Sequence, residues 1–326
     1  MALLTIENLH VAFDTPAGRA AAVRGIDLCV QPGEILGIVG ESGSGKSALF
    51  QGVLGLAGPS AKVEGRAIFD GMNLIGLPDR SMSSIRGRRL SIVFQDPSSS
   101  LNPVIRVGRQ LEEAVRVNGD QAGQHARTSP LARSRELLAE VGIADAERRL
   151  RAYPHELSGG QNQRVMIAMM LAGNPDLLIA DEPTTALDVT VQAQILDLLK
   201  QISRKRGMGV VLISHDLGVV AQICDRLAVM YAGRIVESGP VMDTFDAPRH
   251  PYTVGLMASR PGTARDGRLA PIGGNVPSPL ESRPGCAFEP RCSRRRDICL
   301  RSQPGRGSGD HWWCCHNPLP APTALR

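Results

Sequence analysis

The sequence predicts an α/β fold that binds a nucleotide, and three observations lead to this prediction. The apolar run Ile35–Val39 precedes a glycine-rich stretch, Gly40–Ser47, that fits the phosphate-binding pattern G-x-x-x-x-G-K-S/T. Apolar residues then recur at helical spacing, at Leu49, Val53 and Leu56. Further along, the run Asp176–Ala180 predicts a strand buried on both faces, and two carboxylates follow it. A strand, a glycine-rich loop and a helix in this order are the context that the phosphate-binding pattern requires.

The composition supports a large core and excludes several classes of protein. Apolar residues make up 42% of the 326 residues but aromatic residues only 3%, so the core must be mostly aliphatic. The net charge of +5 is small, and the arginines do not form the basic stripe with interleaved aromatic residues expected of a nucleic-acid binder. No apolar run is long enough to cross a bilayer, and the first residues lack the pattern of a signal peptide. We therefore expect an intracellular protein that contacts a membrane only through partners and has no nucleic-acid partner.

The glycine-rich loop carries the residue types that a triphosphate needs. Gly43 and Gly45 have no Cβ, so the loop can fold tightly and point its amide N–H groups at the β-phosphate. Lys46 can reach the β- and γ-phosphates, and the Ser47 hydroxyl can ligate Mg²⁺. The predicted phosphate contacts are Gly40, Ser42, Gly43, Ser44, Gly45, Lys46 and Ser47.

Before and after this loop, short apolar runs predict further strands. Leu3–Phe13 and Ala22–Val30 are expected to be strands joined by the turn Pro16–Gly18. A small β element is expected at residues 67–75, and Leu90–Phe94 is the next apolar strand.

The composition becomes charged and helical over about residues 98–170, which predicts a helical insertion into the α/β core. Within it, Leu131–Val141 is amphipathic, with Leu137, Leu138 and Val141 facing inward. The alternation then resumes with a helix over Val191–Arg206, and the remaining strands are expected at Val210–Ile213, Leu227–Met230 and Arg234–Val236. We predict a main domain over residues 1–250 and a separate extension, rich in Pro, Gly and Arg, over residues 251–326.

Two more groups of residues suggest catalysis. Asp181 follows a buried strand and can hold Mg²⁺ through a water, while Glu182 can act as the general base or orient the attacking water. The segment Leu157–Gln161 precedes a predicted helix, with Ser158 as its N-cap and two glycines that leave the helix N-terminus open to an anion.

Taken together, these motifs resemble those of the ATP-binding cassette (ABC) ATPases over roughly residues 1–250. The resemblance implies a P-loop fold with a RecA-like core, an antiparallel β subdomain and a helical insertion. It also implies roles for individual residues. Gln95 resembles the glutamine of the Q-loop, which is a Mg²⁺ ligand and acts in catalysis, and His215 resembles the switch histidine that senses the γ-phosphate. The further nucleotide contacts that it implies are Phe13, stacking on adenine, Ser158, Gly159, Gly160 and Gln161 of the signature, and Asp188 of the D-loop.

The family mechanism implies that two cassettes close head to tail around ATP. The signature of one cassette meets the γ-phosphate held by the other, so the nucleotide is bound at a helix N-terminus. Hydrolysis then lets the pair open, and the helical insertion passes the movement to a membrane permease.

The segments Phe94–Pro97, Ser99–Pro103 and His250–Thr253 narrow the resemblance to the oligopeptide, dipeptide and nickel branch of ABC importers. Members of this branch hold a [4Fe–4S] cluster in a cysteine-rich tail. The ligands implied here are Cys286, Cys292, Cys299 and Cys315, with Cys314 as the alternative to Cys315. The spacing is not the tight C-x₂-C run of bacterial ferredoxins, so Zn²⁺ bound by four Cys, or by Cys with His311 or His316, stays open, as does a tail without metal.

The cofactors that the resemblance implies are ATP, Mg²⁺ and, in the tail, a [4Fe–4S] cluster or, alternatively, Zn²⁺. The activity that it implies is the hydrolysis of ATP to power peptide import. The implied partners are two permease subunits, a second identical or different ATPase subunit and, indirectly, an extracytoplasmic binding protein. The expected location is peripheral, on the cytoplasmic side of the inner membrane. The alternatives are an importer of nickel or another small solute, a soluble ABC ATPase outside transport, and an iron–sulfur redox protein with a regulatory ATPase.

Overall fold

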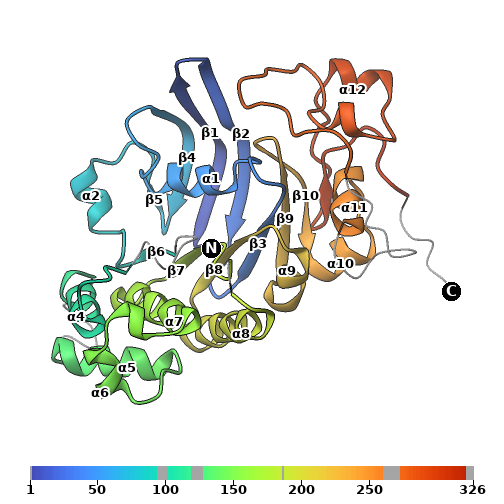
Figure 1. Ribbon diagram of the computed structural model, residues 1–326. Coiled ribbons are helices and arrows are strands. Elements are labelled where there is room, and N and C mark those ends of the chain that lie inside the picture. The colour runs from blue at the N-terminus through green and yellow to red at the C-terminus, as the bar shows by residue number, and fades with distance from the viewer. Residues whose placement is uncertain (1, 94–100, 119–127, 186, 260–271, 321–326) are drawn as a thin grey trace. The chain divides into compact units, whose positions relative to one another are not determined.

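The computed structural model describes residues 2–93, 101–118, 128–185, 187–259 and 272–320, and the chain divides into two compact units (Figure 1). The first unit contains Met1–Val30, Ile35–Gly76 and Leu212–Arg326. The second contains Gln31–Glu34 and Leu77–Val211. Strand β8 (Gly209–Ser214) carries the boundary between them. The predicted division of the chain at residue 250 stays a prediction.

An antiparallel sheet forms the N-terminal part of the first unit. Its strands are β1 (Leu4–Thr15), β2 (Gly18–Val30), β4 (Ala61–Phe69) and β5 (Met72–Asn73), in the order β2-β1-β4-β5. The predicted turn is present, because β1 and β2 form a hairpin that closes where Thr15 pairs with Gly18.

Helix α1 (Lys46–Val53) packs on this sheet. A Cβ on Gly52 would lie only 2.7 Å from the Val11 side chain, so glycine permits the close approach of helix and sheet. The helix ends at Val53, and Gly55 follows in the left-handed region with φ 64°. Leu56, which we expected on the apolar stripe of the helix, therefore lies beyond it and is 40% exposed.

A second group of strands in the first unit has the order β11-β10-β9-β3. These strands are β3 (Ile35–Val39), β9 (Arg226–Tyr231), β10 (Arg234–Pro240) and β11 (Trp312–Trp313). β3 runs parallel to β9, and β10 runs antiparallel to both β9 and β11. The helices of this part are α9 (Leu217–Ile223), which contacts β3, α10 (Val241–Asp246), which contacts β9 and β10, and α11 (Pro251–Ala258).

The C-terminal segment, residues 272–320, contains little regular structure and lies in the same unit as the N-terminal sheet. It holds the 3-10 turn Glu289–Arg291, the short helix α12 (Asp297–Arg301) and β11. Figure 1 shows this segment, coloured orange to red, next to β10. The backbone amide of Cys314 donates to the Val236 carbonyl at 2.8 Å, and this bond extends the pairing to β10.

The second unit pairs two buried parallel strands with a group of helices. Strands β6 (Leu90–Val93) and β7 (Leu177–Asp181) pair in parallel, and every residue of β7 is buried, as its apolar run predicts. The helices are α2 (Asp79–Ser83), α4 (Val107–Asn118), α5 (Pro130–Glu140), α6 (Ala146–Arg151), α7 (Gly159–Met170) and α8 (Val189–Arg206). The predicted inward residues Leu137, Leu138 and Val141 are fully buried.

Within the described ranges, no helix combines the length and apolarity needed to cross a membrane.

Candidate functional site

The loop between β3 and α1 has a shape that only glycine permits. Gly43 and Gly45 have φ of 77° and 99°, a region that other residues rarely adopt. A Cβ on Gly45 would lie 2.2 Å from the Ala22 carbonyl oxygen, and one on Gly40 would lie 2.1 Å from that of Met230. At Gly43, in contrast, a Cβ would meet nothing within 4 Å, so this glycine faces open space. The loop is therefore fixed on one side by the backbone behind it and open on the other.

Lys46 places a buried positive charge inside this loop. The side chain begins α1, is 7% exposed, and donates from Nζ to the carbonyl oxygens of Gly40 at 2.8 Å and Glu41 at 3.1 Å. The Ser44 hydroxyl is buried without a hydrogen-bond partner in the described part of the chain. An ammonium group, a helix N-terminus and a glycine that leaves space are the features that favour a phosphate. The residues of the loop thus fit a nucleotide phosphate.

Arg291 and Tyr252, which lie far from the loop in the sequence, both bind Glu41 of the loop. Arg291 makes a bidentate ion pair with Glu41, from Nη1 at 2.6 Å and from Nη2 at 2.9 Å, and its side chain is only 4% exposed. Arg291 also donates to the Tyr231 hydroxyl and to the Ile272 and Gly273 carbonyls. The Tyr252 hydroxyl accepts a hydrogen bond from the Glu41 amide at 2.9 Å. The sequence does not predict this anchoring, and it singles out Tyr252 only by its position in the segment His250–Thr253.

His250 has a structural role in the segment His250–Thr253, where it caps α11. Its imidazole Nδ1 accepts from the Tyr252 amide and caps α11, while its own amide donates to the Glu237 carboxylate. Burial lowers the pKa of His250 to about 3, so the ring is neutral and can accept the capping hydrogen bond. The cap fixes the first turn of α11, which carries Tyr252.

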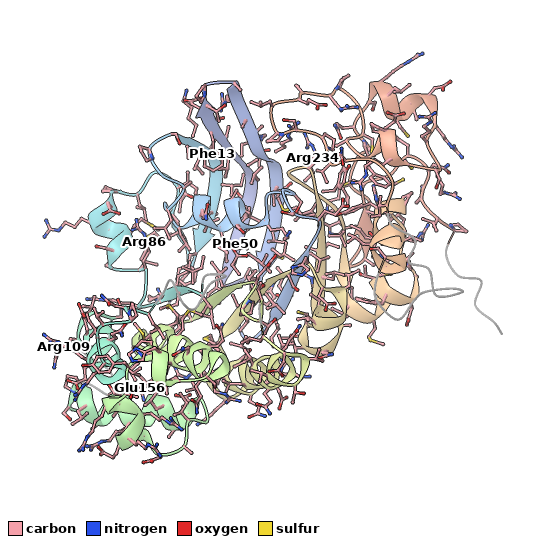
Figure 2. The ribbon with its side chains drawn as sticks, viewed as in Figure 1. Phe13, Phe50, Arg86, Arg109, Glu156 and Arg234 are labelled. Carbon is pink, nitrogen blue, oxygen red and sulfur yellow. The ribbon has the colours of Figure 1, made fainter. Side chains whose placement is uncertain are left out.

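Phe13 and His215 are the other predicted site residues of the first unit. Phe13 lies on β1, is partly exposed and is paired with Ala20 and Ala61 (Figure 2). His215 is exposed immediately after the end of β8, and the next residue, Asp216, caps α9. Adenine stacking by Phe13 and γ-phosphate sensing by His215 stay predictions.

The predicted carboxylates end strand β7 in the second unit. Asp181 is the last residue of the strand and is 8% exposed. Glu182 follows with φ 48°, a strained value for a residue with a side chain, and its carboxylate accepts from the Thr185 hydroxyl at 3.0 Å. The turn therefore holds Glu182 in a fixed direction just beyond the strand.

The N-terminus of α7 has the structure that its sequence predicts. The Ser158 hydroxyl accepts from the Gln161 amide at 3.3 Å, and the Gln161 side chain accepts from the Ser158 amide at 3.2 Å. This capping box leaves Gly159 with room, because a Cβ there would come no closer than 3.5 Å, to Leu187. A Cβ on Gly160 would lie 2.6 Å from Val191, near the start of α8, which Asp188 caps.

The predicted nucleotide residues divide between the two units. Residues Phe13, Gly40–Ser47 and His215 belong to the first unit. Ser158–Gln161, Asp181, Glu182 and Asp188 belong to the second. Gln95 lies outside the described residues. Each half therefore has its own local geometry, and the roles assigned to its side chains stay predictions.

The prediction of a [4Fe–4S] cluster on Cys286, Cys292, Cys299 and Cys315 is wrong. The described residues include all four, and among them no group of three or more His, Cys, Asp or Glu side chains could hold a metal ion. Burial raises the pKa of Cys286 to about 11 and also raises that of Cys292 and Cys315.

The other side chains that we expected around a metal have different contacts. Arg291 pairs with Glu41, and Arg294 donates to Asn317 and to the Pro318 carbonyl. Of the histidines considered for zinc, His311 contacts Glu237 at 2.8 Å and His316 contacts the Ser302 carbonyl at 3.0 Å. The residues of the C-terminal segment therefore do not fit the cluster or zinc.

Comparisons with known proteins place these features in a family. The ABC transporter family model matches residues 23–185, and the model of the oligopeptide/dipeptide transporter C-terminal region matches residues 236–299. A dimeric ATP-binding cassette, solved in a post-hydrolysis state bound to ADP and phosphate, aligns with a TM-score of 0.64 and 28% identity, covering 73% of this chain and 98% of that chain.

Curated relatives align with almost the whole chain. It is 52% identical over 93% of its length to the oligopeptide transport ATP-binding protein OppD of Mycobacterium tuberculosis, but spans only 49% of that protein. It is 49% identical to the dipeptide transport ATP-binding protein DppD of Bacillus subtilis, covering 93% of this chain and 90% of that protein. The chain therefore belongs to the ABC transporter family, has the cassette fold, and carries the C-terminal region of the oligopeptide and dipeptide transporters.

Proposed function

We propose that this chain binds and hydrolyses ATP to power the import of oligopeptides or dipeptides. The observation that carries the proposal is the phosphate loop, in which glycine conformation and the buried Lys46 ammonium create a site for a triphosphate. The names of the OppD and DppD relatives support peptides as the transported class.

In this proposal, the chain's residues divide the work of hydrolysis. The loop amides and Lys46 bind the β- and γ-phosphates, and Phe13 stacks on the adenine. Ser47, Gln95 and Asp181 hold Mg²⁺, which when bound neutralises charge on the phosphate oxygens. Glu182 takes the proton of the attacking water or orients that water, and its fixed turn supports this role.

The signature completes the site in a pair of cassettes. Ser158, Gly159 and Gly160 at the start of α7 bind the γ-phosphate held by a second ATPase subunit, identical or different, while Gln161, Asp188 and His215 contribute around it. The open N-terminus of α7, with room beside Gly159, supports this arrangement. We further propose that two membrane permeases bind the pair on the cytoplasmic side of the inner membrane, and that a binding protein outside delivers the peptide. The C-terminal region acts as a small extension that holds the phosphate loop through Arg291.

Equilibrium titration of the full chain with Mg-ATP tests the nucleotide site. Lys46→Ala removes the ammonium group that faces the phosphates, so we expect affinity to fall at least about tenfold, the equivalent of about 1.4 kcal/mol. Lys205→Ala is the matched control, because Lys205 is exposed at the last turn of α8. Equal ATP affinity of Lys46→Ala and the parent chain would refute the proposed role of the loop.

A further inference from the structure

Glu41 is the only acidic residue in the phosphate loop Gly40–Ser47, and its neighbours in the loop are proposed to bind a triphosphate. A carboxylate near phosphate groups disfavours them, because like charges repel. Glu41 is not among the predicted phosphate contacts, and the loop pattern itself does not require an acidic residue at this place. The contacts of Glu41 within the first unit show how its charge is accommodated.

Both backbone polar groups of Glu41 take part in the shape of the loop. Its amide donates to the Tyr252 hydroxyl at 2.9 Å. Its carbonyl accepts from the Ser44 amide at 3.2 Å and from the Lys46 ammonium at 3.1 Å. Glu41 therefore contacts the cation that is proposed to face the β- and γ-phosphates, and a negative charge on this residue acts on that part of the loop.

The Arg291 guanidinium compensates the carboxylate of Glu41. A guanidinium has five N–H groups to donate, and each of the five has an acceptor here. Nη1 and Nη2 each donate to one carboxylate oxygen of Glu41, at 2.6 Å and 2.9 Å. The other three donate to the Tyr231 hydroxyl at 3.3 Å and to the carbonyls of Ile272 at 3.1 Å and Gly273 at 2.8 Å. The Arg291 side chain is only 4% exposed, so water and salt screen its charge little.

The segment that carries Arg291 is attached to the first unit on both sides of this residue. Before Arg291, the Pro279 carbonyl accepts from the Ala21 amide of β2 at 2.9 Å. After it, the Cys314 amide donates to the Val236 carbonyl of β10 at 2.8 Å. These backbone bonds do not involve the Arg291 side chain. A substitution at Arg291 therefore removes a positive charge from the phosphate loop and leaves the other attachments of the segment in place.

We propose that Arg291 is a positioning residue for ATP, which neutralises the Glu41 carboxylate and so allows the phosphate loop to accept a triphosphate. This inference rests on the ATP site proposed above and gives the C-terminal segment a role in it. Without Arg291, the carboxylate repels the phosphates and competes with them for the Lys46 ammonium. The pairing of Arg291 with Glu41 favours bound ATP, and by reciprocity bound ATP favours that pairing.

Equilibrium titration of the full chain with Mg-ATP at about pH 7.5, where a free carboxyl group is ionised, tests the role of Arg291. Arg291→Gln leaves Glu41 charged and unpaired, so ATP affinity should fall at least about fivefold. The double variant Glu41→Gln, Arg291→Gln has neither charge and should bind ATP within about twofold of the parent. This rescue separates charge compensation from loosening of the loop, because the double variant also lacks the ion pair.

Glu41→Gln alone provides a second test that does not depend on the folding of Arg291→Gln. It removes the carboxylate and keeps the guanidinium, so it should bind ATP at least as tightly as the parent. Weaker binding by Glu41→Gln overturns the proposal. An unchanged ATP affinity of Arg291→Gln, or a double variant as weak as Arg291→Gln, overturns it as well.

Arg294→Gln is the matched control in the same segment. Arg294 donates to Asn317 and to the Pro318 carbonyl, so its loss disturbs the segment without changing the charge beside Glu41. Its ATP affinity should equal that of the parent, and a loss as large as that of Arg291→Gln overturns the specific role of Arg291. Lys46→Ala, titrated in parallel, separates the two proposals. If Lys46→Ala is weakened and Arg291→Gln is not, the ATP site stands and the role of Arg291 falls; if the parent does not bind ATP, both fall.

Discussion

The bidentate pair of Glu41 and Arg291 joins the phosphate loop to a residue 250 positions later in the chain. The Arg291 side chain is 4% exposed and that of Glu41 is 30% exposed, so the pair is largely removed from water. Glu41, as hydrogen-bond acceptor, raises the pKa of Arg291 further, and the guanidinium is always charged. Removing one partner of such a pair leaves a charge without compensation.

We predict that Arg291→Gln lowers the free energy of unfolding by about 2–3 kcal/mol, because Glu41 then loses its partner. Urea unfolding of Arg291→Gln, Glu41→Gln and the double variant measures the coupling, and the double variant should lose less than the sum of the two single losses. The matched control is Arg283→Gln, whose exposed pair with Glu281 should contribute little to stability because water screens it. Additive losses at Glu41 and Arg291 would contradict an energetic role for the pair.

His250 gives a second prediction at the residue scale, a dependence of stability on pH. Its pKa is about 3 in the folded chain, against the ordinary value of 6.5 that the exposed ring has in the unfolded chain. As the pH falls, His250 therefore takes up its proton in the unfolded state before it does so in the folded state. The stability that depends on a neutral His250 is complete above pH 6.5 and is lost towards pH 3. At pH 5 the loss amounts to about 2 kcal/mol.

His250→Asn should remove this dependence, because its amide oxygen can still cap the Tyr252 amide but does not titrate. The measurement is the free energy of unfolding in urea, for the parent and the variant, at several pH values between about 7.5 and about 5. The parent should lose about 2 kcal/mol more than the variant over this range. Parallel pH profiles would show that His250 is not a buried neutral base.

The geometry of individual residues could be predicted from the sequence where it depends on neighbouring residues. The glycines and Lys46 lie within eight consecutive positions, so their spacing alone predicts the shape of the loop. The Glu41–Arg291 pair depends on tertiary structure, and nothing in the local sequence indicates it. The metal prediction failed for the same reason, because four cysteines in one stretch do not determine where their sulfur atoms lie.

At the scale of elements, the start of α7 holds one glycine with room for a side chain and one that is closely packed. A Cβ fits at Gly159 but would lie 2.6 Å from Val191 at Gly160. We predict that Gly160→Ala destabilises the chain by about 1–3 kcal/mol through overpacking, whereas Gly159→Ala changes stability by less than about 1 kcal/mol. Urea unfolding of the two variants makes the comparison, and equal losses would contradict the packing argument.

Gly159→Asp then tests the function of the same helix end without unfolding it. A carboxylate there interacts favourably with the helix dipole but repels a phosphate, so stability should be kept while ATP-driven pairing of cassettes is lost. Analytical ultracentrifugation of the full chain with its ATPase partner, with and without Mg-ATP, measures the pairing. Normal ATP-dependent pairing of Gly159→Asp would contradict the role of α7 as an anion site.

Long apolar runs predicted their elements well, and short elements were missed. β3 has the predicted bounds, and α8 begins only two residues before the prediction because Asp188 supplies its cap. β11 has two residues in a stretch rich in Pro and Gly, and only its pairing with β10 makes it a strand. Periodicity needs more residues than such an element contains.

At the scale of the whole molecule, the two units each carry one part of the predicted site. The first holds the phosphate loop and its anchoring to the C-terminal segment, and the second holds the carboxylates and the signature helix. Apolar runs and motifs predict both parts, because each is formed by neighbouring residues. The hydrolysis proposed above draws on residues of both parts, which makes the turnover of ATP the property to measure.

The most direct test is therefore the steady-state release of phosphate from Mg-ATP by the assembled importer, with Glu182→Gln in this chain. Because the amide cannot take a proton from water, we predict that turnover falls at least about 100-fold at this site. ATP affinity should stay within about threefold of the parent, since Glu182 does not hold the phosphates, and Glu64→Gln, an exposed change on β4, should leave both unchanged. Turnover of Glu182→Gln within about threefold of the parent would contradict the account.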